Sequence, residues 1–454
     1  MARPPSAANN ITTRGQARAG RCQASDEAKV STISRSRTPA YWVLTWYFPG
    51  FFLGSRQSAG AIEGVIVSQE PVRYDARHIQ LLEGWEALRK RPGMYIGSTG
   101  ERGLHQLVFQ IADLALNEVL AGRANCVEVA LMPDGGVRVA DDGPGIPFGD
   151  TGDAGGPGLE AQLTQMHIRK APAGPRYPVL DFFGVGPFAA NALSSRMVAE
   201  VQREGVRRVQ RYARGVAVDA PDDAGPATGS GTVISFWPDP AIFETTECSF
   251  DALAERFREL AFLNKGLDIS LTDERRPSEP RSARFCSPRG VHDMVAFLDE
   301  QAEVLVHSDI ISFELEDQRM EGKTEVGMRW RGSGRALVRS YANSRPTPGG
   351  GTHMAGFLDG MEAAVSTYAR KRRMLTAADP DPAADRISEG LTAVVSVKLE
   401  HPEFEGATRG VLGNSAVRAC VREAVLEHLG SWLEKHPQEA AAVIGRITQG
   451  PQPD

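Results

Sequence analysis

Apolar residues recur at helical spacing in several long stretches of this chain. Between residues 104 and 121 they return every third or fourth position, which predicts one long helix, Leu104–Ala121. The same spacing, together with start and stop signals, predicts further helices. These are Glu83–Lys90, Phe188–Ser194, Phe250–Phe262, Val291–Leu305, Met354–Arg373 and Ala416–Lys435.

Short apolar runs bounded by turn residues predict strands between these helices. The turn Pro133-Asp134-Gly135, for example, separates two of the runs. The predicted strands are Cys126–Met132, Gly136–Ala140, strands within Met197–Tyr212, Thr232–Trp237, Ile310–Leu315, Glu325–Trp330, Ala336–Tyr341 and Leu391–Leu399. Because helices and strands alternate without regular βαβ units, the pattern predicts an α/β (α+β) protein with two sandwich domains.

Composition shifts divide the chain. Residues 151–178 are rich in Gly, Pro and Ala and predict a mobile loop, and the arginine-rich stretch Asp273–Arg289 predicts a domain boundary. The predicted domains are therefore 71–284 and 285–450. Residues 1–70 show little apolar periodicity and predict a disordered extension, or a start codon assigned too far upstream. Their apolar run Tyr41–Leu53 is too short to cross a membrane.

Charge and cysteine content exclude some functions. The net charge of −6 gives no overall attraction to DNA, so any DNA contact would need a local basic patch. The five cysteines are widely spread and predict neither a disulfide framework nor a zinc site. These features favour a location in the reducing cytoplasm.

Three segments together predict a nucleotide site. The long helix carries Gln110 and Asp113, and Asp141–Pro147 (DDGPGIP) follows a strand directly. A carboxylate at a strand end can accept a hydrogen bond from the amino group of adenine, and neighbouring glycines let a flat base approach the backbone. Gly184 and Gly186 precede a helix whose N–H groups could bind phosphates. Each motif alone is weak, and a tight turn explains any one of them equally well.

A collinear series of segments carries a family resemblance. The longest is Glu83–Ser98 (EGWEALRKRPGMYIGS). The others are Gly103–His105, Leu120–Gly122, Asp142–Gly143, Asn191–Ser194, Gln202–Gly205, Phe236–Pro238, Arg258–Asn264, Gly350–His353, Glu389–Leu391 and Leu412–Ser415. From Tyr74 to Ile447 the chain resembles the ATPase and transducer region of the bacterial DNA gyrase B and topoisomerase IV family, which belongs to the GHKL superfamily.

This resemblance implies a GHKL-type α/β sandwich followed by a transducer domain with a fold like that of ribosomal protein S5. It also implies a dimer formed through N-terminal arms, in which Tyr74 and Ile79 would contact the partner subunit. The partner would be a second copy or a gyrase B protein, with gyrase A and DNA engaged indirectly and no membrane. The sequence shows no EGDSA motif of a DNA-cleaving TOPRIM domain, so we expect that this chain does not cut DNA by itself.

Three departures from the family pattern fall on positions that the resemblance assigns to catalysis or metal binding. Gln110 stands where the family has its general base, and losing a positioned base costs about 10²–10⁴-fold in rate. Leu114 replaces the asparagine that binds Mg²⁺, and a leucine offers no oxygen ligand. Arg409 replaces the transducer lysine that reaches the γ-phosphate. The chain is therefore predicted to bind no metal through these positions.

Further departures affect the phosphate end of the predicted site. The family's GGLHGVG reads Leu180-Asp181-Phe182-Phe183-Gly184-Val185-Gly186 here, and Pro144 replaces an arginine. The adenine end is retained. The resemblance assigns cofactor binding to Asp113, Asp141, Gly145, Gly184, Gly186, Arg203 and Thr232. ATP is the predicted cofactor.

Three functions remain open at this stage. The first is a hydrolysis-deficient paralogue that acts as a dimerising or regulatory module. The second is an active ATP-hydrolysing topoisomerase subunit that works with a separate DNA-cleavage subunit. The third is a protein that sequesters aminocoumarin-type inhibitors at the adenine end of the site.

Overall fold

The structure is a computed structural model that describes residues 84–149, 158–166, 176–179, 185–276, 278–300, 302, 304–376, 378–406 and 409–449. All of them belong to one compact unit, Leu81–Asp454. The predicted extension 1–70, and the arm residues Tyr74 and Ile79, lie outside the described residues. We call residues 84–286 the N-terminal part and residues 291–449 the C-terminal part.

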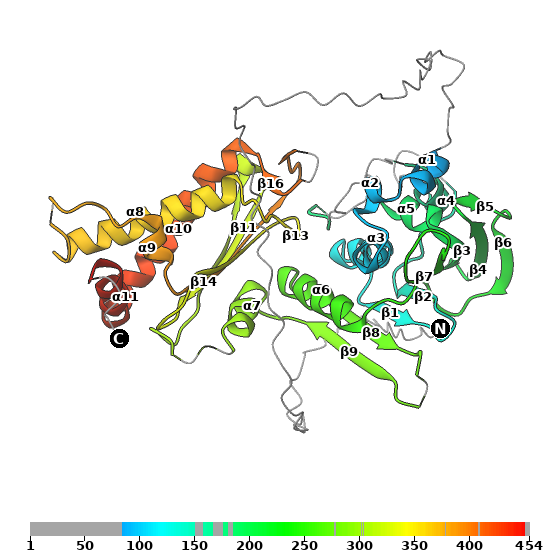
Figure 1. Ribbon diagram of the computed structural model, residues 1–454, viewed down its shortest axis with the longest axis horizontal. Helices are drawn as coiled ribbons and strands as arrows, with labels where there is room; N and C mark the ends of the chain where they lie inside the picture. Colours follow the sequence, from blue (N-terminus) through cyan, green and yellow to red (C-terminus); the bar gives the residue numbers. More distant parts are fainter. Residues whose placement is uncertain are drawn as a thin grey trace, which may run out of the picture. The chain divides into compact units, whose positions relative to one another are not determined.

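The N-terminal part is built on one large sheet (Figure 1). Its strands run in the order β5-β4-β3-β7-β2-β1-β8-β9, with β6 paired to β4. Neighbouring strands are antiparallel except β1 and β8, which are parallel. The strand bounds are β1 Val127–Leu131, β2 Val137–Asp141, β3 Ser194–Arg203, β4 Val206–Ala213, β5 Val216–Ala217, β6 Asp222–Pro226, β7 Gly231–Pro238, β8 Asp268–Asp273 and β9 Arg281–Cys286.

Helices pack against this sheet and enclose a single hydrophobic core. The helix bounds are α1 Gly84–Lys90, α2 Gly93–Ile96, α3 Glu101–Leu120, α4 Leu159–Thr164, α5 Pro187–Ala192 and α6 Phe250–Leu263. Helix α3 is central because its apolar side contributes buried residues such as Leu104, Leu107 and Ile111 to the core. Helix α6 begins at the N-cap Ser249, whose Oγ accepts a hydrogen bond from the Ala252 N–H.

The C-terminal part has a second sheet in the order β10-β11-β14-β12-β13. All nine residues of β14 are buried, as expected for a central strand covered on both faces. The strand bounds are β10 Ile311–Asp317, β11 Gly322–Trp330, β12 Leu337–Ala342, β13 Arg345–Pro346 and β14 Leu391–Leu399. A separate hairpin follows, with β15 Phe404–Glu405 and β16 Val411–Leu412.

Long helices cover one face of this second sheet. Helix α8, Thr352–Lys371, lies beside α10, Ser415–Lys435 (Figure 1), and both contribute to one core with the sheet. Helix α7, Val291–Leu298, packs on the opposite face through Val291, Met294 and Val295. The remaining helical elements are the 3₁₀ turn Gln318–Met320, α9 Ala384–Ser388 and α11 Pro437–Gln449.

Most predicted elements appear within a few residues of their expected bounds. Several others differ or were not predicted, among them the short helices α2 and α9 and strand β8. Helix α4 lies inside the segment predicted as a loop, 151–178. Strand β9 lies inside the predicted boundary stretch and extends the first sheet to Cys286 by pairing with β8, so it crosses the boundary predicted after residue 284. Helix α7 ends at Leu298 instead of Leu305, and α11 was not predicted at all.

Candidate nucleotide site

Helix α3 presents the first group of predicted site residues. Gln110 is only 1% exposed, and neither its Oε1 nor its Nε2 has a hydrogen-bond partner among the described residues. Leaving a buried amide without hydrogen bonds is energetically costly. Leu114, one turn further, packs against the hydrophobic core. Asp113 is half-buried between them. The helix therefore offers no carboxylate at the base position and no oxygen at the metal position.

The end of β2 carries the second group. Asp141 lies directly opposite Thr232 of β7. The Asp141 carboxylate accepts a hydrogen bond from the Gly143 N–H at 3.0 Å, and Thr232 Oγ1 accepts one from the Ile146 N–H at 2.9 Å. These bonds fold the DDGPGIP turn back over the strand end. Asp141 and Thr232 are thus held close together by the backbone that surrounds them.

Burial makes Asp141 an unusual acid. Desolvation raises its pKa to about 6, the nearby charge of Glu118 adds to the rise, and the hydrogen bond from Gly143 opposes it. The adjacent Asp142 differs because it is exposed and its carboxylate accepts hydrogen bonds from Asn125 and Cys126. Despite a desolvation contribution that raises it, those bonds lower the Asp142 pKa below its ordinary value. Asp141 is therefore the carboxylate suited to a ligand.

Gly145 and Arg203 complete this end of the site. Gly145 has φ +79°, and a Cβ there would lie 2.6 Å from the Gln202 carbonyl oxygen, so only glycine fits. The Arg203 guanidinium donates to the Gly145 carbonyl oxygen at 3.0 Å. The structure thus brings together Asp141, Gly145, Arg203 and Thr232. Their role in binding adenine stays a prediction.

The phosphate end is described only in part. Gly184 and Asp181 lie outside the described residues. Gly186 is the N-cap of α5 with φ +64°, and Pro187 occupies the first helical position. A proline has no N–H, so this position cannot donate to a phosphate. Pro187 is a signal that motif reading overlooked, although it is visible in the sequence.

Arg409 lies in the hairpin loop between β15 and β16. Its φ is +50°, and its backbone N–H donates to the Gly406 carbonyl oxygen at 3.2 Å. Within the part of the chain that the structure describes, no hydrogen bond or ion pair joins its side chain to α3 or β2. The structure therefore does not bring Arg409 into contact with Gln110 or Asp141.

Gly231 is another residue that motif reading missed. Its φ is +151°, and a Cβ at this position would lie 2.2 Å from the Asp141 carbonyl oxygen. Glycine thus allows β7 to pass close to the end of β2. Its place directly before Thr232 is a signal that could have been noticed in the sequence.

The side chain at position 114 does not suit a metal ion. Among the described residues, no group of three or more His, Cys, Asp or Glu could hold a metal ion. Leu114 is apolar where Mg²⁺ would need an oxygen ligand, so these side chains do not fit the ion.

Among the described residues, no helix is long and apolar enough to cross a membrane.

Comparison with known proteins gives consistent relatives. The family model described as DNA gyrase B matches residues 290–452. The DNA gyrase B protein of Streptomyces coelicolor is 43% identical over 392 residues, which cover 83% of this chain and 57% of that protein. The DNA gyrase B protein of Mycobacterium tuberculosis is 38% identical over 409 residues, covering 84% and 60%. The chain therefore spans less than two thirds of these relatives.

Two solved structures share the fold. The 43K ATPase domain of Thermus thermophilus gyrase B, solved with an aminocoumarin, has a TM-score of 0.67 and 35% identity, covering 81% of this chain and 94% of that one. The topoisomerase IV ATP-binding domain of Francisella tularensis, solved with an inhibitor, has a TM-score of 0.67 and 27% identity, covering 81% and 97%. These likenesses confirm the predicted fold class, and the chain belongs to the DNA gyrase B family.

Proposed function

We propose that this chain binds an adenine nucleotide but hydrolyses ATP weakly or not at all, and that it acts as a dimerising or regulatory module. The contrast within the site carries the proposal. Backbone hydrogen bonds hold Asp141 and Thr232 at the strand ends, which supports a base-binding role. At the two positions that the family resemblance assigns to the general base and the Mg²⁺ ligand, α3 has the amide Gln110 and the apolar Leu114. A general base must carry a basic atom within reach of the attacking water, and an amide does not provide one.

A steady-state ATPase assay tests the catalytic half of this proposal. We expect the purified chain to turn over far more slowly than the matching fragment of a gyrase B relative, by more than about 10²-fold. The double variant Gln110→Glu with Leu114→Asn should gain Mg²⁺-dependent activity, because it restores both missing functions. Turnover by the unmodified chain close to that of the fragment would overturn the proposal.

Nucleotide binding is tested separately by calorimetric titration of ATP and ADP, each with and without Mg²⁺. We expect binding that depends little on Mg²⁺, since Leu114 cannot ligate the ion. Asp141→Ala should weaken binding strongly. The matched control is Glu128→Ala, which removes an exposed carboxylate from the neighbouring strand β1. Equal effects of both variants, or no binding by the unmodified chain, would contradict a base site at Asp141.

The alternative is an active ATPase subunit that works with a separate DNA-cleavage subunit. Its support is the 43% identity to a DNA gyrase B protein. This function predicts Mg²⁺-dependent phosphate release without any substitution, and supercoiling or relaxation once a cleavage subunit and gyrase A are added. If only the double variant at positions 110 and 114 releases phosphate, the alternative fails.

Partners and location follow from the same family. We propose a homodimer, or a heterodimer with a gyrase B protein, formed through the arm that contains Tyr74 and Ile79, in the cytoplasm. Contact with gyrase A and DNA would then be indirect. An aminocoumarin is a useful probe of the base end, since one was solved with a relative. Binding of that compound, lost in Asp141→Ala, would support the same site and would also keep the inhibitor-sequestering function open.

A further inference from the structure

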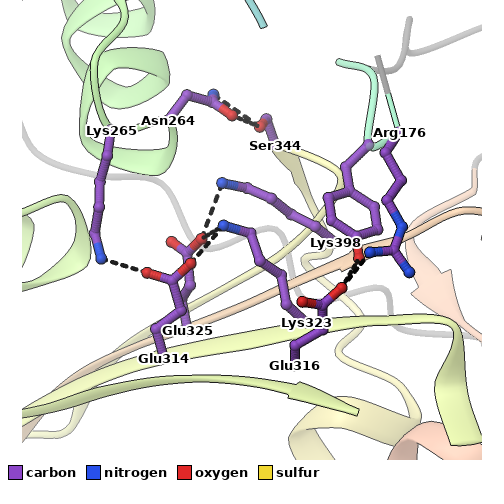
Figure 2. Close-up of polar contacts among 10 residues, drawn as sticks. Arg176, Asn264, Lys265, Glu314, Glu316, Lys323, Glu325, Ser344 and Lys398 are labelled. Atoms are coloured by element: carbon purple, nitrogen blue, oxygen red, sulfur yellow. Dashed lines mark hydrogen bonds and ion pairs between the residues drawn. The ribbon is translucent and has the colours of Figure 1, made fainter. Parts of the chain in front are cut away.

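Four consecutive residues, Arg176–Val179, connect helix α3 to the second sheet. The Arg176 guanidinium forms an ion pair with Glu316 of β10 (Figure 2). It forms a second ion pair with Glu400, which follows β14. The Tyr177 hydroxyl donates to Glu316 Oε1 at 3.2 Å. At the other end of the segment, the Val179 N–H donates to Asn117 Oδ1 of α3 at 2.9 Å. One short segment thus contacts both parts of the molecule.

A second ionic contact lies at the end of α6. Lys265 Nζ pairs with Glu314 Oε2 of β10 at 2.5 Å. Glu314 also pairs with Lys323 of β11 at 2.6 Å, so two cations share this carboxylate (Figure 2). Burial raises the pKa of Glu314, but the hydrogen bonds from Lys265 and Lys323 outweigh it and hold the value at about 2. Glu314 therefore stays charged across the physiological range of pH.

The partners on β10 are placed by strand periodicity. Glu314 and Glu316 are two residues apart, so their side chains leave the same face of the sheet. Glu314 lies opposite Glu325, and Glu316 lies opposite Lys323. The other face of β10 contributes Ile311 and Phe313 to the core with α8 and α10. The charged face of the sheet is consequently the one that meets Arg176 and Lys265.

A neutral contact lies beside the ionic ones. Asn343 and Ser344 both have positive φ, 48° and 62°, and both are buried. Ser344 Oγ exchanges hydrogen bonds with the Asn264 amide at 2.9 and 3.2 Å, and the Arg256 guanidinium donates to the Ser344 carbonyl oxygen at 2.9 Å. Hydrogen bonds thus hold this turn against α6 without an ion pair.

We propose that Arg176 with Glu316 and Glu400, and Lys265 with Glu314, form an ionic latch that holds the C-terminal part against the N-terminal part, and that salt opens it. The side chains of the latch are partly exposed, 53% for Arg176 and 42% for Lys265. Pairs of this kind are screened by added salt, whereas buried polar contacts are screened much less. Because Val179 is bonded to α3, the latch joins the helix of the nucleotide site directly to the second sheet.

Hydrogen–deuterium exchange of the full chain in the absence of nucleotide tests this latch. The reporters are the amide of Val179 and the segment 343–347, because both lie where the two parts meet. We expect their exchange to become faster by about fivefold or more in 1 M KCl than in 50 mM KCl, as expected when exposed ion pairs are screened. Segments inside either core, such as β14, should not change.

Variants give an independent measurement. Arg176→Ala with Lys265→Ala should produce the fast exchange already at low salt, and Arg176→Lys with Lys265→Arg should restore slow exchange. The matched controls are Arg138→Ala, which breaks an exposed pair with Glu274 inside the N-terminal part, and Arg418→Ala, which breaks a pair with Asp359 inside the C-terminal part.

Unchanged exchange at both reporters in 1 M KCl would overturn the proposal, and so would an equal response of the control variants. The salt series needs no substitution, so it decides the question even if the double variant fails to fold. Because nucleotide is absent throughout, the result does not depend on whether the chain binds or hydrolyses ATP.

Discussion

At residue 110 the chain has a buried amide that no other described residue satisfies, in a family position that calls for a carboxylate. One turn away, Leu114 joins the hydrophobic core instead of facing an ion. In the proposed function, these two side chains separate the capacity to hold a nucleotide from the capacity to cleave it. Asp141 and Thr232 lie opposite each other on β2 and β7, where backbone hydrogen bonds hold them.

Asp141 leads to a prediction about stability and pH. The pKa of Asp141 in the folded chain is about 6, above the ordinary value of 3.8. At pH values between 3.8 and about 6, the folded chain therefore binds a proton that the unfolded chain has released. The free energy of unfolding therefore falls as pH rises from about 4 to 6. It stays lower at higher pH, because the buried carboxylate is then ionised. We expect Asp141→Asn to stabilise the nucleotide-free protein by about 1–3 kcal/mol at pH 8 and by little at pH 4.

Urea unfolding at the two pH values measures this effect. Asp142→Asn is the matched control, because the pKa of Asp142 is lowered and its charged form is the one that accepts hydrogen bonds from Asn125 and Cys126. That variant should lose stability at pH 8. At pH 8 the free energy of unfolding should therefore rise in Asp141→Asn and fall in Asp142→Asn. A fall in both variants would contradict a pKa of Asp141 that burial raises.

Strand β14 provides a second prediction. Lys398 Nζ is buried and pairs with Glu325 Oε1 of β11 at 3.0 Å, and Lys323 pairs with the same oxygen at 2.9 Å. Removing Lys398 leaves the buried Glu325 carboxylate paired with Lys323, so its charge is only partly compensated. We expect Lys398→Met to cost about 1–3 kcal/mol in the free energy of unfolding, and the addition of Glu325→Gln to recover part of that loss.

Chemical denaturation would measure both variants. Lys371→Met is a suitable control, since Lys371 pairs with Glu434 on the surface and such pairs contribute about 0–1 kcal/mol. A cost for Lys398→Met no greater than for Lys371→Met would show that the buried pair contributes nothing particular to the strand.

Helices α8 and α10 lead to a prediction about packing. A Cβ at Gly356 would lie 2.3 Å from the Arg418 carbonyl oxygen, and one at Gly360 would lie 2.7 Å from Val425 Cβ. The two helices approach closely because these positions have no side chain. We expect Gly356→Ala to destabilise the protein by about 1–3 kcal/mol, as overpacking does.

Gly430 of α10 is the matched control, because a Cβ there meets nothing within 4 Å. Gly430→Ala should stabilise the protein by about 0.5–1 kcal/mol through helix propensity alone. Thermal unfolding of the two variants checks the pair. A stabilising Gly356→Ala would mean that α8 can move away from α10 at little cost.

The elements that the sequence predicted well are those with strong local signals. Leu391–Leu399 is a continuous apolar run and forms β14 with the same bounds. Strand β9 was missed because Arg281–Cys286 is polar, and only its backbone pairing with β8 places it in the sheet. For α11 a signal was present, since Ala440, Val443, Ile444 and Ile447 have helical spacing and all are buried.

In the predicted site, too, some residues have local sequence signals, whereas other properties depend on the three-dimensional surroundings. The motif at the strand end singled out Asp141, and the family resemblance added Gly145 and Thr232, which the structure places beside it. The isolation of Gln110 and the high pKa of Asp141 could not be predicted, since both depend on what surrounds the side chain in three dimensions. The ionic contacts of Arg176 join residues far apart in sequence and carry no local signal.

For the whole molecule, the family predicts a dimer that depends on the N-terminal arm. Tyr74→Ala with Ile79→Ala should lower the dimer fraction in sedimentation velocity with a non-hydrolysable ATP analogue, because both side chains would leave the partner's site. A control variant is Tyr95→Ala, on α2. A dimer fraction that is unchanged by the arm substitutions would exclude this mode of association.

Pro187, at the first position of α5, would affect how well the proposed site distinguishes ATP, ADP and AMP. A site with fewer amide donors gains less from each added phosphate group, so its affinities for ATP, ADP and AMP draw closer together. Its occupancy would then follow the total adenylate concentration and not the ratio of ATP to ADP. A protein of this kind would respond to nucleotide supply while remaining indifferent to the energy charge.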